Sequence, residues 1–291
     1  MHTPSSRAAS LYIVDVFAEK PYAGNQLAVV VGADWSADRM QAFAFEMNFS
    51  ETTFASATAA NGCFDVRIFT PAQELPFAGH PTLGTAWVLR QYCCGAPPPA
   101  SLTLRLGIGE VPVEFEDALV RMRPRSPELG VVMDAQVMAA HLGLGADALD
   151  PRYPCRRASI GIEFVLVPLR DLASLRAAKP ASLPAAAPGT ILGVFAFAPE
   201  AYEPGGDVSA RMFFGAFGIR EDPATGSASA CLAAYLSAES YFGSPKVRAR
   251  VQQGYECGRP SCLYIAAEPA GTGFAVEVAG KVVLVARGEV A

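Results

Sequence analysis

The fold is indicated most directly by two similar stretches of sequence, Gly79-His80-Pro81-Thr82-Leu83-Gly84-Thr85-Ala86 and Glu221-Asp222-Pro223-Ala224-Thr225-Gly226-Ser227-Ala228. An offset of 142 residues aligns their prolines and their glycine–hydroxyl pairs, and it places His80 opposite Asp222. Each stretch leads into a run of small and apolar residues, which is typical of the start of a buried helix. We therefore predict a duplicated fold with one such helix start in each half of the chain.

The two predicted helix starts also indicate a binding function. The first N–H groups of a helix have no partner within it, and the helix dipole favours an anion beside them. If both starts face one cleft, they would hold a carboxylate between them. Gly79, Gly84 and Gly226 would then allow close approach, and Ser227 would donate its hydroxyl. The alternative is that these glycines only relieve crowding.

The composition is that of an ordered globular protein. Of 291 residues, 51% are hydrophobic and 18% are charged, and the length is sufficient for two domains. The net charge is −5 and no basic run is present, so nucleic acid is not an expected partner. No stretch has the length of an apolar transmembrane helix, and residues 1–10 lack the apolar core of a signal peptide. We expect a cytoplasmic protein that does not bind membranes.

The cysteines and histidines argue against a metal site. The seven cysteines are odd in number and show no metal-binding spacing, so reduced thiols are the expected state. The histidines are only three, His2, His80 and His141, which excludes a histidine-rich site. We therefore expect no metal.

Hydrophobic periodicity and turn residues predict the helices and strands. In the first half, Ser36 is the expected N-cap of a helix over Ala37–Met47, and a second helix covers about 81–91. In the second half, a helix over 227–237 carries no charge before Glu239, so all its sides must be buried. The predicted strands cover residues 11–17, 27–31, 50–56, 64–70, 102–106, 111–116, 119–123, 160–167, 190–197, 210–214, 247–252, 261–266 and 274–278, and residues 177–188 form a predicted loop.

This pattern predicts an α+β fold of two similar barrel-like halves, each a curled mixed sheet around a central helix. The expected halves are residues 1–120 and 121–291, with the option that the C-terminal strand crosses back to the first half.

Several further motifs occur in order along the chain. They are Asp15-Val16-Phe17 with Gly24-Asn25, Asn48-Phe49-Ser50-Glu51-Thr52-Thr53-Phe54, Phe69-Thr70-Pro71, Pro76-Phe77-Ala78-Gly79-His80-Pro81-Thr82, the stretch 221–228, Gln253-Gly254 and Gly258-Arg259-Pro260-Ser261. Together they resemble the phenazine-biosynthesis PhzF-like isomerase family, which has the diaminopimelate-epimerase fold. The resemblance covers most of the chain. It implies an active site in the cleft between the halves, a homodimer and no cofactor.

The resemblance also implies roles for single residues. Glu51 is the general acid/base, and His80, Asp222 and Ser227 line the substrate pocket. The related epimerases have a catalytic cysteine where this chain has Ala78, and residues 221–228 contain no cysteine, so the two-thiol epimerase mechanism is missing. The family's usual Gly-Asn-Pro is Gly-Asn-Gln at residues 24–26, which affects the local turn and not the chemistry.

Each site residue also has a purely structural interpretation. Glu51 lies among Phe49, Thr52, Thr53 and Phe54, which favours a pocket lined by aromatic side chains, where one carboxyl could take and return a proton. The alternative is a glutamate on the solvent face of a strand. In the structural interpretation, His80 does no more than shape the turn before its helix, and Asp222 does no more than cap the helix that follows it.

Three functions fit these residues. The leading one is a cofactor-independent isomerase that moves a proton within a small carboxylate-bearing metabolite, with Glu51 as the acid/base. The second is an epimerase that uses Glu51 and either Asp222 or His80 as bases on opposite faces. The third is a non-catalytic protein that binds small metabolites, since a fold does not fix a function.

Overall fold

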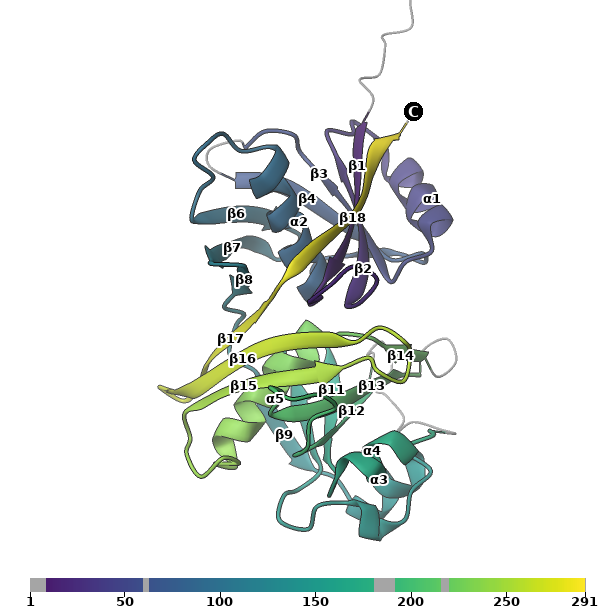
Figure 1. Ribbon diagram of the computed structural model, residues 1–291, viewed down its shortest axis with the longest axis vertical. Helices are drawn as coiled ribbons and strands as arrows, with labels where there is room; N and C mark the ends of the chain where they lie inside the picture. The colour runs from purple at the N-terminus through teal and green to yellow at the C-terminus, as the bar shows by residue number, and fades with distance from the viewer. Residues whose placement is uncertain (1–8, 60–62, 181–191, 216–219, 291) are drawn as a thin grey trace, which may run out of the picture. The chain divides into compact units, whose positions relative to one another are not determined.

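The computed structural model divides the chain into two compact units (Figure 1). Unit 1 comprises Met1–Met122 and Gly280–Ala291, and unit 2 comprises Arg123–Ala279. The last strand, β18 (Val282–Val290), belongs to unit 1, because it pairs with the first strand of that unit. The residues that the structure describes are 9–59, 63–180, 192–215 and 220–290.

Unit 1 contains two helices, α1 (Ala37–Met47) and α2 (Gly79–Tyr92). Its other strands are β1 (Ala9–Val16), β2 (Asn25–Val31), β3 (Glu51–Ala55), β4 (Cys63–Phe69), β5 (Glu74–Leu75), β6 (Ser101–Leu106), β7 (Gly109–Glu116) and β8 (Leu119–Met122).

The strands of unit 1 form a mixed sheet in the order β18-β1-β2-β3-β4-β6-β7-β8. The β2–β3 and β4–β6 pairs are parallel and the others are antiparallel, while the short β5 pairs with β4. Helix α2 contacts β18 and β1 at one end of this order and β8 at the other. The sheet therefore curls around α2, and α1 packs on the outside against β3 and β4.

Unit 2 has three α-helices and a short 3-10 helix among its described residues: α3 (Ala135–His141), α4 (Leu172–Ala177), α5 (Gly226–Ala238) and η1 (Ala146–Ala148). Its strands are β9 (Glu128–Val132), β10 (Arg156–Ser159), β11 (Glu163–Pro168), β12 (Leu192–Ala198), β13 (Val208–Phe214), β14 (Arg220–Asp222), β15 (Val247–Gln253), β16 (Ser261–Ala270) and β17 (Gly273–Gly280).

The sheet of unit 2 repeats that of unit 1. Its order is β9-β10-β11-β12-β13-β15-β16-β17, the β11–β12 and β13–β15 pairs are parallel, and the short β14 pairs with β13. Read along each order, parallel and antiparallel pairs alternate in the same way in both units. Helix α5 contacts β9, β11, β15 and β16, and it occupies the place that α2 has in unit 1. The predicted duplication is therefore present in the topology.

The two central helices are buried because their sequences contain small and apolar residues on every side. In α5, every residue from Gly226 to Ser237 except Ser227 is buried, as the absence of charge predicts. In α2, Gly84 faces the sheet, and a Cβ there would lie 2.6 Å from Leu27 Cδ2 and 2.7 Å from Val16 Cγ2. Gly84 therefore allows the helix to pack closely on the sheet. This agrees with the alternative interpretation, in which the glycine only relieves crowding.

Several elements of unit 2 differ from the sequence prediction. Helices α3 and α4 and strands β9, β10 and β14 were not predicted. The strand predicted over 160–167 is wrong at its start, because β10 ends at Ser159 and β11 begins at Glu163. Most of the loop predicted over 177–188 lies outside the described residues, and Ala177 is the last residue of α4.

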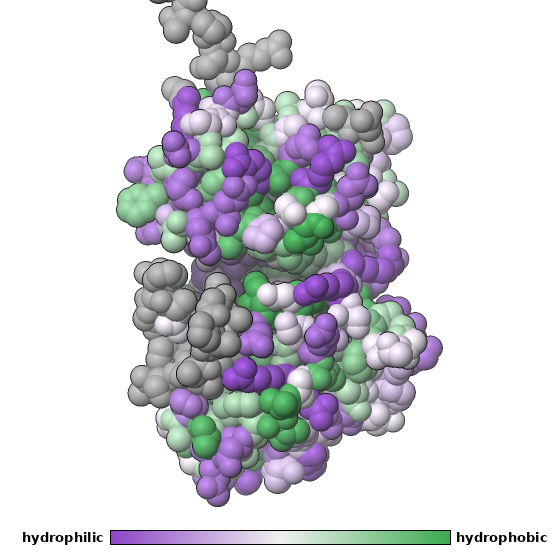
Figure 2. Space-filling model, turned by 180° about the vertical axis from the view of Figure 1, so that it is seen from behind, coloured by the Kyte–Doolittle hydropathy of each residue, from purple (hydrophilic) through white to green (hydrophobic). Residues whose placement is uncertain are grey.

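The surface is polar over much of the face that Figure 2 shows, and hydrophobic residues appear there in small separate groups. Within the described part of the chain, no helix is long and apolar enough to cross a membrane.

Candidate active site

Strand β3 directs Glu51 towards the central helix of unit 1. Side chains alternate along a strand, so Glu51 and Thr53 share a face. The Thr53 hydroxyl lies 2.8 Å from that of Thr85 on α2, which shows that this face points to the helix. Phe54 lies on the opposite face, where its ring packs against those of Phe43 and Phe69 beneath α1. Of the aromatic side chains expected to line the Glu51 pocket, Phe54 therefore does not do so.

Glu51 meets His80 at the start of α2. His80 is the second residue of that helix, and its Nε2 lies 3.5 Å from Oε2 of Glu51. The side chain of His80 is 7% exposed and that of Glu51 is 17% exposed. Glu51 is thus neither fully buried nor on a solvent face, which excludes the structural alternative of an exposed strand glutamate.

The protonation of His80 follows from its surroundings. Burial lowers the pKa of His80 from 6.5 to about 3, although a hydrogen bond with the Gln26 backbone acts in the opposite direction. Among the described residues, Nε2 has no hydrogen-bond partner, so the bond to the Gln26 carbonyl is made by Nδ1. The imidazole is therefore neutral near pH 7, with its proton on Nδ1 and the lone pair of Nε2 turned to Glu51.

This arrangement suits a carboxyl that gains and loses a proton. When Glu51 is ionised, two sets of lone pairs face each other across 3.5 Å. When Glu51 carries a proton, it can donate a hydrogen bond to Nε2. The geometry thus allows Nε2 of His80 to accept a hydrogen bond from a protonated Glu51.

The loop between β1 and β2 holds the Gln26 backbone in place. Asp15 is buried and its Oδ2 accepts a hydrogen bond from the Tyr22 N–H at 2.7 Å. Gly24 has φ +67°, and a Cβ there would lie 2.3 Å from the Val16 carbonyl oxygen. Only glycine fits this position, so the turn forms although the usual proline is replaced by Gln26.

In unit 2, Asp222 lies just before the start of α5. The N-cap of this helix is Thr225, and not Asp222. Asp222 Oδ2 accepts a hydrogen bond from the Thr225 hydroxyl. The alternative that Asp222 is the N-cap residue is therefore wrong, while Ser227, in the first turn of the helix, is only partly buried.

The structure corrects the alignment of the two halves. Helix α2 begins at Gly79 and α5 begins at Gly226, which is an offset of 147 residues and not 142. His80 therefore corresponds to Ser227, each the second residue of its helix, and not to Asp222. The glycine–hydroxyl pair falls inside α2 but at the start of α5, which explains the wrong offset.

Neither helix start is capped by a side chain. The N-cap of α2 is Ala78, which has no polar side chain, and the Thr225 hydroxyl does not cap α5. Both starts therefore keep first-turn N–H groups that can bind an anion.

The predicted site residues fall into two groups. Unit 1 brings together Glu51, Gly79 and His80, and unit 2 brings together Asp222, Gly226 and Ser227.

Sequence reasoning gave no role to Gln253, which is fully buried at the end of β15. Its side chain binds the Asp222 carbonyl and the Thr225 backbone at the start of α5. The signal was present in the motif Gln253-Gly254. Gly254 has φ +81°, and a Cβ there would lie 2.6 Å from the Pro223 carbonyl oxygen.

No metal or disulfide chemistry is evident in what the structure describes. Over residues 9–59, 63–180, 192–215 and 220–290, no group of three histidine, cysteine or acidic side chains could hold a metal ion. All seven cysteines lie within these ranges as free thiols.

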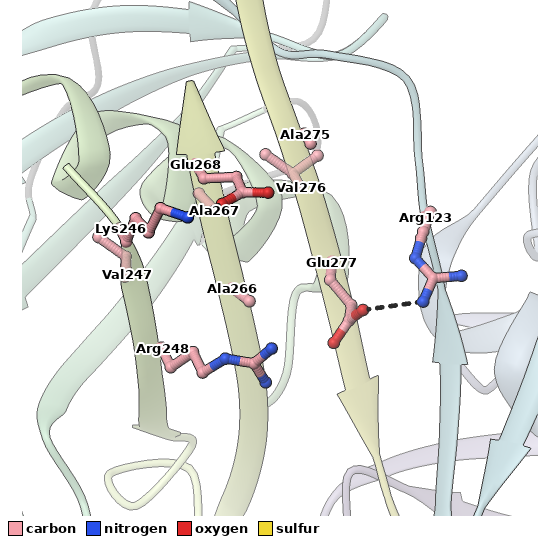
Figure 3. Close-up of a pocket in the computed structure, with 10 residues that line it drawn as sticks. All are labelled: Arg123, Lys246, Val247, Arg248, Ala266, Ala267, Glu268, Ala275, Val276 and Glu277. Atoms are coloured by element: carbon pink, nitrogen blue, oxygen red, sulfur yellow. Dashed lines mark ion pairs between the residues drawn. The ribbon is translucent and has the colours of Figure 1, made fainter. Parts of the chain in front are cut away.

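A hollow of about 570 Å³ lies on strands β15, β16 and β17 of unit 2 (Figure 3). Arg123 pairs with Glu277 there at 3.4 Å, and Lys246 pairs with Glu268 at 2.9 Å. None of the described residues that line this hollow is a predicted site residue. This hollow is therefore not part of the candidate site.

Comparison with known proteins gives a consistent result. The model of the family described as phenazine biosynthesis-like protein matches residues 14–288. The chain is 36% identical over 285 residues to the trans-2,3-dihydro-3-hydroxyanthranilate isomerase of Pseudomonas aeruginosa, with 95% of this chain and 97% of that protein covered.

Solved structures show the same fold. A PhzF-family phenazine biosynthesis protein from Bacillus anthracis has a TM-score of 0.87 at 26% identity, with 98% of this chain and 99% of that chain covered. A probable proline racemase from Agrobacterium radiobacter K84 has a TM-score of 0.61 at 13% identity, with 97% and 93% covered, and shows the fold alone. The predicted α+β, diaminopimelate-epimerase-like fold is confirmed.

Proposed function

Because this chain belongs to the phenazine biosynthesis-like protein family and is an isomerase, we propose that it moves a proton within a small carboxylate-bearing metabolite. Glu51 is the general acid/base, and no cofactor takes part. The observation that carries this proposal is the contact between Glu51 and the neutral ring of His80, 3.5 Å apart.

The proposed reaction has two proton transfers. The Glu51 carboxylate takes a proton from a carbon of the substrate, and the electron pair of that C–H bond delocalises towards the substrate carboxylate. The new Glu51 carboxyl donates a hydrogen bond to Nε2 of His80. It then returns the proton to a different carbon on the same face, the double bond shifts, and the enzyme regains its starting state.

The helix starts supply the binding and electrostatic part of the mechanism. In the proposal, the first-turn N–H groups at Gly79 and Gly226, with the Ser227 hydroxyl, hold the substrate carboxylate. Negative charge grows on this carboxylate in the transition state, so donors fixed there stabilise the transition state more than the substrate. Asp222 lines the same pocket as a hydrogen-bond acceptor.

The first substrate to test is trans-2,3-dihydro-3-hydroxyanthranilate, on which the Pseudomonas aeruginosa relative is named to act. It is a small ring compound with a carboxylate, as the proposal requires. A homodimer and a cytoplasmic location belong to the same proposal, since the family resemblance and the free thiols support them.

A two-base epimerase is the second candidate, with Glu51 as one base and either Asp222 or His80 as the other. Inversion of one stereocentre with solvent exchange would favour the epimerase.

Proton NMR of the compound with the purified protein in deuterated water tests the proposal. We expect the double bond to shift, with deuterium at the new C–H position only to the extent that the Glu51 carboxyl exchanges its proton with solvent before returning it. A protein that binds carboxylates but catalyses no exchange of a C–H proton would instead be the metabolite-binding protein of the third hypothesis.

A further inference from the structure

Gln253 makes three hydrogen bonds to the segment that carries Asp222 into α5. Its Nε2 lies 2.7 Å from the Asp222 carbonyl oxygen and 3.1 Å from Oγ1 of Thr225, and its Oε1 lies 3.2 Å from the Thr225 backbone nitrogen. The side chain of Gln253 is fully buried. Bulk solvent therefore does not reach this side chain, and the fold fixes the geometry of its bonds.

The backbone partners determine which way the amide points. The Thr225 N–H can only donate, so it requires the amide oxygen, and the Asp222 carbonyl can only accept, so it requires the amide nitrogen. Nε2 therefore also donates to Oγ1 of Thr225. The hydroxyl proton of Thr225 is then directed to Oδ2 of Asp222, with which it makes a short hydrogen bond.

We propose that Gln253 is a positioning residue that holds Asp222 as a fixed hydrogen-bond acceptor at the start of α5. The chain of donors runs from Gln253 through the Thr225 hydroxyl to Oδ2 of Asp222, and it has one direction only. Oδ2 of Asp222 is therefore held in place as an acceptor by the Thr225 hydroxyl. This inference rests on the proposed function, because it assigns Glu51 to moving the proton and Asp222 to keeping the geometry of the pocket.

The neighbouring residue provides a matched control. Gln252 is also buried, and its amide also binds one backbone N–H and one carbonyl, both of Glu203, at 3.0 and 3.1 Å. Because side chains alternate along β15, these bonds lie on the other face of the strand. Gln252→Leu and Gln253→Leu thus remove comparable bonds, but only the second affects the segment with Asp222.

Steady-state kinetics with trans-2,3-dihydro-3-hydroxyanthranilate test the positioning role. We expect Gln253→Leu and the isosteric Gln253→Glu to lower kcat at least about tenfold, because a small misplacement of a site group is costly. Gln252→Leu keeps kcat. Thr225→Val should lower kcat as much as Gln253→Leu, while Thr225→Ser should retain more of kcat than Thr225→Val. The double variant Gln253→Leu/Thr225→Val should lose no more of kcat than either single variant, because both substitutions break the same chain of hydrogen bonds. A kcat for Gln253→Leu equal to that of Gln252→Leu overturns the proposal.

Amide hydrogen exchange of the Thr225 N–H tests the same proposal without any substrate. The acceptor for this buried N–H is Oε1 of Gln253. We expect its exchange to rise at least about tenfold in Gln253→Leu and to stay unchanged in Gln252→Leu. Equal protection in both variants rejects the role of Gln253. Inactivity of the wild type with normal Thr225 protection rejects the proposed substrate and leaves the positioning supported.

Discussion

Nε2 of His80 lies 3.5 Å from Oε2 of Glu51, although the two residues are 29 positions apart in the sequence. Glu51 begins a strand and His80 is the second residue of a helix. Burial keeps the ring of His80 neutral, so the contact becomes a hydrogen bond only when Glu51 carries a proton. In the proposed function, this is the proton that Glu51 takes from the substrate.

Glu51→Gln removes this proton carrier and keeps the size and polarity of the side chain. We expect the variant to fold, to bind ligand and to lose at least about a hundredfold in rate, the lower scale of general acid–base catalysis. The shift of the double bond, followed by proton NMR, measures the rate. Glu46→Gln, the same change on an exposed residue of α1, is the control. Near-normal turnover by Glu51→Gln would eliminate Glu51 as the base.

His80 should make the stability of the fold depend on pH. In the unfolded chain this histidine takes a proton below its ordinary pKa of 6.5, but in the folded state it does so only near 3. The unfolded state therefore binds more protons in this window, and stability falls as the pH drops from 6.5. Between pH 6.5 and 5 the loss is about 2 kcal/mol.

Urea unfolding of the wild type and of His80→Asn at several pH values checks this prediction. The wild type should lose more unfolding free energy than the variant between pH 6.5 and 5. Parallel pH dependences for the two proteins would show that His80 is not the group responsible.

Gly84→Ala should destabilise the protein. The added Cβ would lie 2.6 Å from Leu27 Cδ2 and 2.7 Å from Val16 Cγ2, in a layer where helix and sheet are closely packed. We expect a loss of about 1–3 kcal/mol in unfolding free energy, typical of overpacking. The control is Gly95→Ala, where a Cβ would meet no atom within 4 Å. Equal stabilities of the two variants would contradict the packing role of Gly84.

The start of α5 should respond unequally to two substitutions. Gly226→Val places a side chain where the proposal puts the substrate carboxylate, and it should weaken binding of a carboxylate probe more than about tenfold. Ser227→Ala removes one hydroxyl and should weaken binding about fivefold, the effect of one hydrogen bond. Calorimetric titration gives both affinities, and thermal unfolding confirms that both variants fold. The reverse order, or a crystal-bound carboxylate far from residue 226, would argue against this site.

Local sequence signals predicted the central parts of the fold well. The helix over Ala37–Met47 begins and ends as predicted, because Ser36 is a genuine N-cap whose hydroxyl accepts from the Arg39 N–H. The sequence predicted the burial of α5 correctly, because a helix without charged residues has no side that favours water. Such signals depend only on residues close in the sequence.

The missed features depend on residues far apart in the sequence. The five-residue error in aligning α2 with α5 arose because a glycine–hydroxyl pair serves packing in one helix and the helix start in the other. Likewise, Gln253 was recognised as part of a motif, but its role depends on Asp222, 31 positions away. Neither the role of each glycine–hydroxyl pair nor the contact of Gln253 with Asp222 can be recognised without the fold.

The return of the chain from unit 2 to unit 1 has a consequence for biosynthesis. Strand β18 follows all of unit 2 in the sequence, yet it pairs along all of β1, from Ala9 opposite Val290 to Val16 opposite Val282. All of unit 2 has therefore left the ribosome before unit 1 can complete its sheet, and until then β1 is an open edge. The inserted second unit can fold first, while the enclosing first unit must wait for β18.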